Sequence, residues 1–211
     1  MINPFHYPKA KHSRKLHPPA YANYRQYKPE LREEFEGQCV YCRMLDAVKG
    51  REGFGVDHYR PKKHFPHLAT EYFNLFYCCN RCNSLKWNFW PSRINRANGQ
   101  FVPNPCEHVM FDHLRYRGGA IEANSNAGEW TAELLLLNDA LAVNFREAYI
   151  KALDLVFAQL RASKATVAEA KTQIAKKGLV SPDSDRVATA LKRAEENVKG
   201  LEDQLKALLG Q

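Results

Sequence analysis

Apolar side chains recur every three or four positions in three parts of the chain, and this spacing predicts helices. In residues 21–36 the recurring positions are Tyr24, Tyr27, Leu31 and Phe35. Because proline has no N–H to give to a helix interior, we expect this helix to begin near Pro29 or to kink there. Gly37 follows as its stop.

The other two helical patterns lie in the second half of the chain. Residues 129–177 contain no proline and repeat apolar residues at Leu134, Leu137, Leu141, Phe145, Tyr149, Leu153, Val156 and Leu160. This pattern predicts one long helix or two. We expect Gly178 to interrupt it. Ser181 as N-cap and Pro182 at the first helical position then begin another helix that runs to about residue 209.

An apolar stripe along this last helix consists of Leu191, Val198, Leu201, Leu205 and Leu208. The two helical stretches therefore predict a helical hairpin whose apolar faces pack against each other. A coiled coil that binds a partner is the alternative, because the heptad pattern is poorly sustained.

The remaining segments are shorter and carry turn signals. We expect a tight loop at residues 39–42, a polar connection over 43–55, an extended segment at 56–59, a loop over 64–70, and a helix over 79–89 that Pro91 ends. Two runs, 109–116 and 120–123, predict a β-hairpin across Gly118-Gly119. The fold class is thus α+β and mostly helical. We divide the chain into a basic N-terminal arm (1–20), a central domain (21–128) and a helical C-terminal region (129–211).

Positive charge is concentrated in the first half of the chain. Residues 1–100 carry 17 Lys and Arg against 8 Asp and Glu, whereas residues 101–211 carry 14 against 15. The net charge of +8 therefore comes from the half that also holds most of the cysteines. A basic surface raises the local concentration of a polyanion, which favours a nucleic-acid partner over a solubilising role alone.

The apolar runs are too short to cross a membrane. Leu134–Leu137 is a run of only four leucines, and the basic N-terminus has no apolar segment of the kind a secretory signal needs. Six cysteines without such a signal indicate thiols and metal binding rather than disulfides. We therefore expect a cytoplasmic protein without a membrane anchor.

Four cysteines form two CxxC pairs about forty residues apart. The pairs are Cys39 with Cys42 and Cys79 with Cys82. Each pair presents two sulfurs on one tight turn, and two such turns complete a tetrahedral thiolate site for a structural zinc ion. Cys78 has no CxxC partner, and Cys106 stands alone as a small buried residue.

The order of motifs CxxC, DHxxPK, NL and CxxCNxxK between residues 39 and 86 resembles the HNH endonuclease superfamily in its zinc-stapled form with a ββα-metal core. The resemblance implies four catalytic roles in this chain. His58 would be the general base and Asp57 a metal ligand. Asn74 would brace the loop, and Asn83, where many relatives have histidine, would be the second metal ligand.

The chemistry of these side chains suits phosphodiester hydrolysis. That reaction needs a base for water and a cation on the scissile phosphate. Oxygen ligands from Asp57 and Asn83 favour Mg²⁺ or Mn²⁺ over zinc. Adjacent strand residues point to opposite faces, so Asp57 and His58 can share a centre only if the strand is distorted or the phosphate lies between them. Candidate phosphate contacts are Arg60, Lys62, Lys63, Arg81 and Lys86.

A closer resemblance is to the small HNH nuclease components of Septu-type antiphage systems and related retron-associated effectors. It rests on the run from His58 to Lys62 and on the leucine-rich segment Leu134–Leu141. It implies DNA cleavage beside an ATPase partner, which would dock on the C-terminal helices. Two alternatives stay open: a non-catalytic zinc-dependent nucleic-acid-binding module, and an RNA-directed nuclease.

Overall fold

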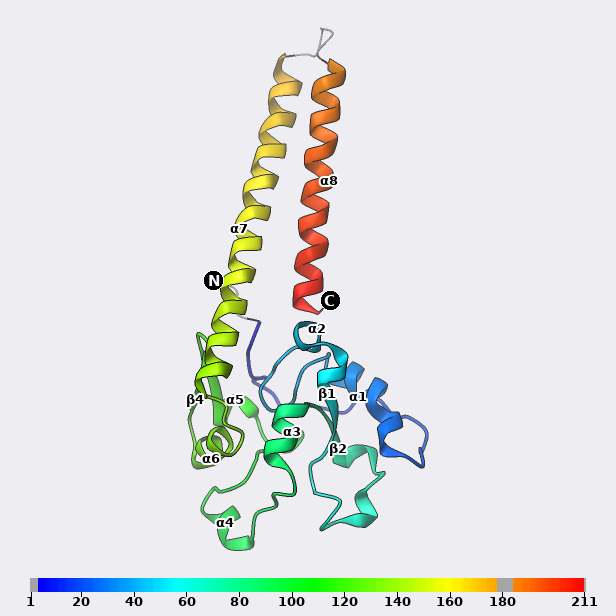
Figure 1. Ribbon diagram of the computed structural model, residues 1–211, viewed down its shortest axis with the longest axis vertical. Helices are drawn as coiled ribbons and strands as arrows, with labels where there is room; N and C mark the ends of the chain where they lie inside the picture. The colour runs from blue at the N-terminus through cyan, green and yellow to red at the C-terminus, as the bar shows by residue number, and fades with distance from the viewer. Residues whose placement is uncertain (1–3, 178–183, 211) are drawn as a thin grey trace. The chain divides into compact units, whose positions relative to one another are not determined.

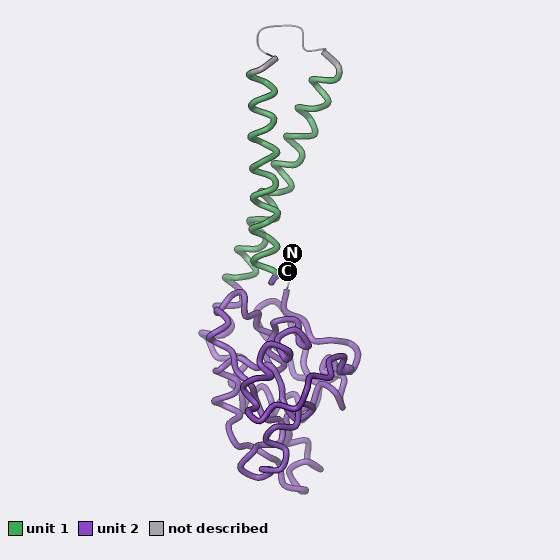
Figure 2. Tube along the Cα trace, turned by 90° about the vertical axis from the view of Figure 1, so that its right-hand side faces the viewer, with its two compact units in different colours: residues 1–2, 148–209, 211 green, residues 3–147, 210 purple. Residues whose placement is uncertain are grey.

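In the computed structural model, residues 4–177 and 184–210 are described. The chain divides into two compact units (Figure 2). One unit ends at Glu147, and the other runs from Ala148 to Leu209. The predicted break at Gly178 and the predicted cap at Ser181-Pro182 lie outside the described residues.

A two-stranded antiparallel sheet and one helix form the centre of the first unit (Figure 1). Strand β1 (Phe54–His58) pairs with β2 (Leu75–Cys79), and helix α3 (Asn80–Lys86) follows β2 directly. The register places His58 opposite Leu75 and Asp57 opposite Phe76. All five residues of β2 are buried. This ββα arrangement confirms the predicted core, although α3 ends at Lys86, before the predicted end near Phe89.

Short helical segments surround this core. The first predicted helix is observed as the 3₁₀ turn η1 (Tyr24–Tyr27) followed by α1 (Lys28–Glu34), with Pro29 in its first turn. Gly37 follows at a positive φ of 66°, a conformation that glycine adopts without steric cost. The predicted polar connection contains helix α2 (Asp46–Lys49) and the turn η2 (Arg51–Gly53). Two further turns, η3 (Pro66–Leu68) and η4 (Tyr72–Asn74), lie between the strands.

The N-terminal arm packs on the core rather than extending from it. Residues 4–20 form no helix or strand, yet the side chains of Phe5 and Tyr7 are buried. The Tyr7 hydroxyl donates to the Tyr41 carbonyl at 2.7 Å, and its ring stacks on Tyr116 with centroids 5.4 Å apart. The proline-rich sequence of the arm thus excludes regular structure without excluding tight packing.

The remainder of the first unit contains a second hairpin and three helices. Strands β3 (Leu114–Arg117) and β4 (Ala120–Ala123) pair across Gly118-Gly119, as predicted, but the residues just before them form α5 (Met110–His113) rather than strand. Helix α4 (Arg93–Ala97) was not predicted. Helix α6 (Asn126–Leu134) begins at Ser125, whose hydroxyl accepts from the Gly128 N–H.

Two long helices form the second unit. Helix α7 (Ala140–Lys177) crosses the boundary between the units, and α8 (Ser184–Leu209) packs against its later part. Leu153 and Leu160 of α7 and Leu201 and Leu205 of α8 are buried. Ion pairs Lys164–Glu202 and Lys171–Glu195 run along the exposed side. The predicted C-terminal helical hairpin is thereby confirmed. No helix among residues 4–177 and 184–210 combines the length and apolar character of a membrane span.

Candidate functional site

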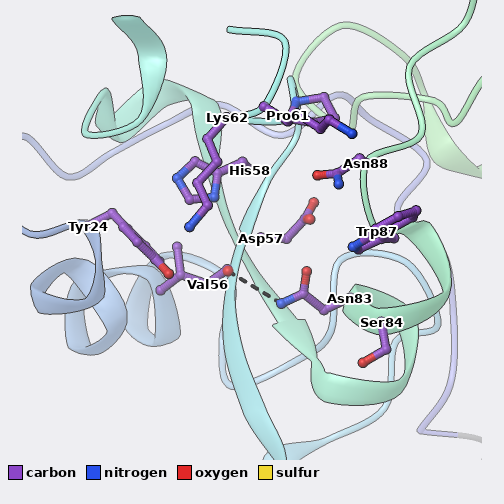
Figure 3. Close-up of a pocket in the computed structure, with 11 residues that line it drawn as sticks. Tyr24, Val56, Asp57, His58, Pro61, Lys62, Asn83, Ser84, Trp87 and Asn88 are labelled. Carbon is purple, nitrogen blue, oxygen red and sulfur yellow. Dashed lines mark hydrogen bonds between the residues drawn. The ribbon is translucent and has the colours of Figure 1, made fainter. Parts of the chain in front are cut away.

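A cavity of about 500 Å³ opens at the end of β1 (Figure 3). Three of the four predicted catalytic residues line it: Asp57, His58 and Asn83. The other lining residues are Tyr24, Val56, Pro61, Lys62, Lys63, Ser84, Trp87 and Asn88. Figure 3 shows the His58 ring and the Asp57 carboxylate on opposite sides of the chain. Both nevertheless reach the cavity, so a group bound within it can lie between them.

The imidazole of His58 is held in one orientation. Its Nε2 lies 2.9 Å from the Ala69 carbonyl oxygen, which can only accept, so Nε2 carries the proton and Nδ1 has the free lone pair. The ring also meets the edge of Tyr24, with centroids 4.6 Å apart. Burial lowers the pKa of His58 from its ordinary value of 6.5. The imidazole is therefore neutral at pH 7, as a general base must be.

Asp57 lies deeper, in a buried ion pair with Lys86 of α3. The Lys86 ammonium is 3.1 Å from Asp57 Oδ1 and 3.0 Å from Oδ2, and it also donates to the His58 carbonyl at 2.9 Å. The Tyr41 hydroxyl donates to Asp57 Oδ2 at 2.6 Å. These bonds tie the end of β1 to α3 and to the first cysteine loop, which holds the backbone of His58 in place.

Asn83 projects from the middle of α3 toward the same cavity. Its Nδ2 donates to the Val56 carbonyl at 3.4 Å, which leaves Oδ1 pointing toward the Asp57 side chain (Figure 3). A carboxylate and an amide oxygen are the hard donors that Mg²⁺ and Mn²⁺ take. The donor types around the cavity thus fit a divalent cation, with Lys86 sharing the carboxylate.

Asn74 lies outside the cavity and binds the loop that follows β1. Its Oδ1 accepts from the Arg60 N–H at 2.9 Å, and its Nδ2 donates to the carbonyls of Arg60 and Leu68 at 3.1 and 3.2 Å. Its backbone carbonyl accepts from the Tyr59 N–H at 2.9 Å. These are the contacts a residue needs to brace the loop between His58 and Ala69.

The five basic residues predicted to contact phosphate have different surroundings. Lys62 and Lys63 are exposed and line the cavity. The guanidinium of Arg60 lies over the Trp90 ring, 5.7 Å from its centroid.

The other two are engaged within the protein. Arg81 pairs with Asp139 and donates to the Leu136 carbonyl at 3.0 Å. Lys86 is buried against Asp57. This differs from the expected surface contact, because an ammonium that compensates a buried carboxylate is withheld from solvent.

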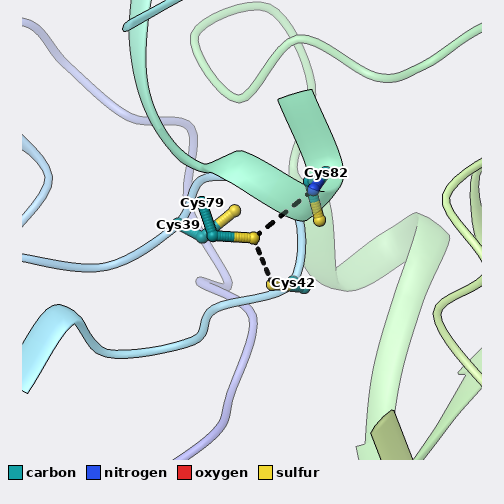
Figure 4. Close-up of side chains that lie close together, drawn as sticks. All are labelled: Cys39, Cys42, Cys79 and Cys82. Atoms are coloured by element: carbon teal, nitrogen blue, oxygen red, sulfur yellow. Dashed lines mark hydrogen bonds between the residues drawn. The ribbon is translucent and has the colours of Figure 1, made fainter. Parts of the chain in front are cut away.

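The four cysteines of the two CxxC pairs converge at the start of α3 (Figure 4). All four are buried, and their sulfurs lie within 4.8 Å of one another. The Cys42 and Cys79 sulfurs are 3.7 Å apart. Tetrahedral zinc with Zn–S bonds of about 2.3 Å requires sulfurs about 3.8 Å apart. The cluster can therefore hold a metal ion, and its spacing fits zinc.

The two remaining cysteines are not part of this set. The buried sulfur of Cys78 lies 3.9 Å from that of Cys39, and burial raises the pKa of its thiol. Cys106 is half-buried elsewhere. The CxxC spacing thus distinguished Cys79 from its neighbour Cys78 correctly.

A histidine and two oxygen donors thus line one cavity of a ββα unit, and four thiols converge at the start of its helix. Residues 39–89 match the family model of the HNH endonucleases. The predicted resemblance is confirmed over this HNH region. The chain is also 27% identical over 110 residues to the Septu protein PtuB of Bacillus thuringiensis. That match covers 51% of this chain and 39% of the relative, so it spans less than half of the relative's length. No solved structure matches the chain.

Several residues of the HNH region contribute to the site but were not predicted from the sequence. Tyr41 binds Asp57, and its position between the two cysteines of a CxxC pair gave no sign of this contact. The Ala69 carbonyl that orients His58 belongs to the backbone, so no side-chain motif identifies it. Trp87 and Asn88 line the cavity directly after the CxxCNxxK motif, and this position was a usable signal.

Proposed function

We propose that this protein is a metal-dependent endonuclease that hydrolyses DNA phosphodiester bonds with His58 as its general base. The observation that carries the proposal is the orientation of His58. Its Nε2 is fixed on the Ala69 carbonyl, and its free Nδ1 belongs to a ring that lines the same cavity as Asp57 and Asn83. The match of residues 39–89 to the HNH endonucleases supports the same reaction.

In the proposed reaction, His58 Nδ1 removes a proton from a water molecule beside the scissile phosphate. The water oxygen forms a bond to phosphorus, the bond to the leaving oxygen breaks, and solvent protonates that oxygen. During the reaction, the hydrogen bond from Asn74 to the Arg60 carbonyl would hold the loop between His58 and Ala69 in place, and the bond from Lys86 to the His58 carbonyl would hold the end of β1. These residues act by positioning the base.

We propose two metal sites. Cys39, Cys42, Cys79 and Cys82 would hold a structural zinc ion, since four thiolates leave no position for water. Asp57 and Asn83 would hold Mg²⁺ or Mn²⁺. When bound, that cation would stabilise negative charge on the phosphate and on the leaving oxygen.

The basic residues around the cavity would bind the phosphate backbone. Lys62 and Lys63 line the cavity, which supports this role for both. Arg60 adjoins them on the same loop. Arg81 and Lys86 have internal partners, so we propose that they support the site from within α3 rather than from its surface.

The similarity to the Septu protein PtuB supports a role in antiphage defence. We propose that the protein acts there with an ATPase partner, which would dock on the hairpin of α7 and α8. Leu155 of α7 is exposed and available for such a contact. The six unpaired cysteines suit a reducing compartment, which supports a location in the cytoplasm.

The test is a plasmid-nicking assay with Mg²⁺ or Mn²⁺. Removal of a general base costs about 10²- to 10⁴-fold in rate, so we expect His58→Ala to lose cleavage by that factor while it keeps its fold. His67→Ala removes an exposed histidine from the same loop and should cut like the wild type. Equal cleavage by His58→Ala and His67→Ala would exclude His58 as the base.

Two further measurements, a gel shift with the plasmid and cleavage of a structured RNA, separate the alternatives. A non-catalytic binding module would retain the plasmid in a gel-shift experiment without nicking it. An RNA-directed nuclease would leave the plasmid intact and cut a structured RNA in a His58-dependent way. Nicking of the plasmid by the wild type alone supports the DNA endonuclease.

A further inference from the structure

Trp87 differs from the other two tryptophans in its surroundings. Trp90 packs against the rings of Tyr59 and Phe65 and under two guanidinium groups, and Trp130 packs against Phe89. The Trp87 side chain is 73% exposed. Within residues 4–177 and 184–210, no aromatic ring or cation packs against its indole. Most of the indole surface is therefore free of contacts within the protein.

The backbone at Trp87 is strained and well anchored. Its φ is 43° and its ψ is −120°, a region that bulky residues rarely occupy. Its N–H donates to the Asn83 carbonyl, and the next turn closes through Phe89 N–H and the Lys86 carbonyl, both at 2.9 Å. Two residues of the site thus hold the backbone that projects this indole. Strain of this kind is found most often at active sites and ligand-binding sites.

The position of Trp87 beside two lysine side chains favours a ligand that carries both phosphate groups and aromatic bases. The indole lines the cavity with His58 and Lys62 (Figure 3), and Lys63 is a further lining residue. Proteins that bind single-stranded nucleic acid combine a positive groove for the phosphates with aromatic rings on which bases stack. A lone exposed apolar residue needs no explanation by itself. Trp87, however, shares its cavity with the His58 imidazole and with the ammonium groups of Lys62 and Lys63.

Building on the proposed nuclease function, we propose that Trp87 stacks on a nucleobase next to the scissile phosphate, and that the site therefore prefers an unpaired strand. In a duplex, both faces of each base are covered by neighbouring pairs. An indole can reach a base face only where the strand is single or the base is turned out of the helix. The proposed substrate class is thus nucleic acid with unpaired bases at the cut.

The experiment measures binding rather than cleavage, with every variant made in the His58→Ala background. The probes are a short fluorescein-labelled single strand, a strand of equal length with abasic sites at its centre, and the matching duplex. Trp87→Gly removes the indole, and glycine tolerates the positive φ without strain. Trp87→Phe retains a ring. Ile94→Ala removes a side chain with the same exposed fraction, 73%, that does not line the cavity.

Loss of one stacked base weakens binding about 5- to 150-fold. We expect Trp87→Gly to lose this factor on the ordinary strand and nothing on the abasic strand. Trp87→Phe should keep most of the affinity, Ile94→Ala all of it, and the duplex should bind more weakly than the single strand. An equal loss on ordinary and abasic strands, or no loss, overturns the stacking role. A duplex that binds as tightly as the single strand overturns the preference for unpaired bases.

These outcomes are independent of catalysis. If the wild type cuts no plasmid or RNA but Trp87→Gly selectively loses the ordinary strand, the stacking inference stands and the nuclease proposal fails. If the wild type cuts but the His58→Ala parent binds ordinary and abasic strands alike, the nuclease stands and the stacking inference fails.

Discussion

The Lys86 ammonium lies 3.0 Å from the Asp57 carboxylate, and the two side chains are only 1% and 2% exposed. A buried charge without its partner is costly, because the interior solvates it poorly. This relationship connects the stability of the fold to the site, since Asp57 faces the cavity and Lys86 also binds the His58 carbonyl.

We predict that Lys86→Met destabilises the protein by about 3–5 kcal/mol, because it retains the volume of the side chain but leaves Asp57 uncompensated. The measurement is urea unfolding at neutral pH. Lys63→Met is the matched control, since Lys63 is exposed at the same cavity, and it should change stability by no more than about 0.5 kcal/mol. Equal stabilities of the two variants would show that the ion pair contributes little.

A second prediction concerns the brace at Asn74. Asn74→Ala removes three hydrogen bonds to the Arg60 and Leu68 backbone, and leaving such groups unpaired costs about 1–3 kcal/mol. We expect a lower melting temperature and, because the loop carries His58 and Ala69, slower nicking at saturating DNA. Asn80→Ala removes an exposed asparagine with a single bond to the Glu52 carbonyl. Should both variants nick at the wild-type rate, Asn74 would have no positioning role.

The four-cysteine cluster gives a third prediction, on metal content. Cys39→Ser should lose zinc and much of the stability, because the proposed ion would join the first cysteine loop to the start of α3. Cys106→Ser, at a half-buried position outside the cluster, should retain both. Elemental analysis of the purified proteins and a thermal melt with and without chelator test this. A Cys39→Ser protein that melts like the wild type would contradict a structural ion.

Glu34 gives a fourth prediction, on pH. Burial alone would raise the pKa of this carboxyl group, but hydrogen bonds from the Lys15 and Leu16 N–H groups and the Tyr72 hydroxyl outweigh burial and lower it. A carboxyl with a lowered pKa in the folded state stabilises the protein above its unfolded pKa of 4.5. That contribution is lost as the pH falls through the folded-state pKa.

Glu34→Gln should therefore cost about 1.5–3 kcal/mol at neutral pH, the range for hydrogen bonds to a charged group. The difference from wild type should shrink as the pH falls below 4.5. Glu33→Gln, on the exposed side of the same helix, is the control. Denaturant unfolding across the acidic range tests the sign: a difference that grows on acidification would refute it.

The sequence predicted those parts of the candidate site whose residues lie close together along the chain. Two CxxC pairs identified the four converging sulfurs, because each pair needs only one tight turn to present two ligands. The DH pair and Asn83 were identified by their order along the chain, and the structure brings all three to one cavity. Lys86 is the exception: its motif position suggested a surface contact, whereas the fold buries it against Asp57.

By itself, the sequence determined the helical hairpin and the thiolate cluster, because apolar periodicity and short motif spacings act over a few residues. The ββα core was implied only by the resemblance of its motifs to the HNH endonucleases. The tertiary structure decided which partner each polar group meets. It packs the N-terminal arm into the core through Phe5 and Tyr7. It orients His58 through the Ala69 carbonyl, eleven residues away, and it leaves Trp87 exposed at the same cavity as His58. Such contacts join segments distant along the chain, and no local pattern of side chains encodes them.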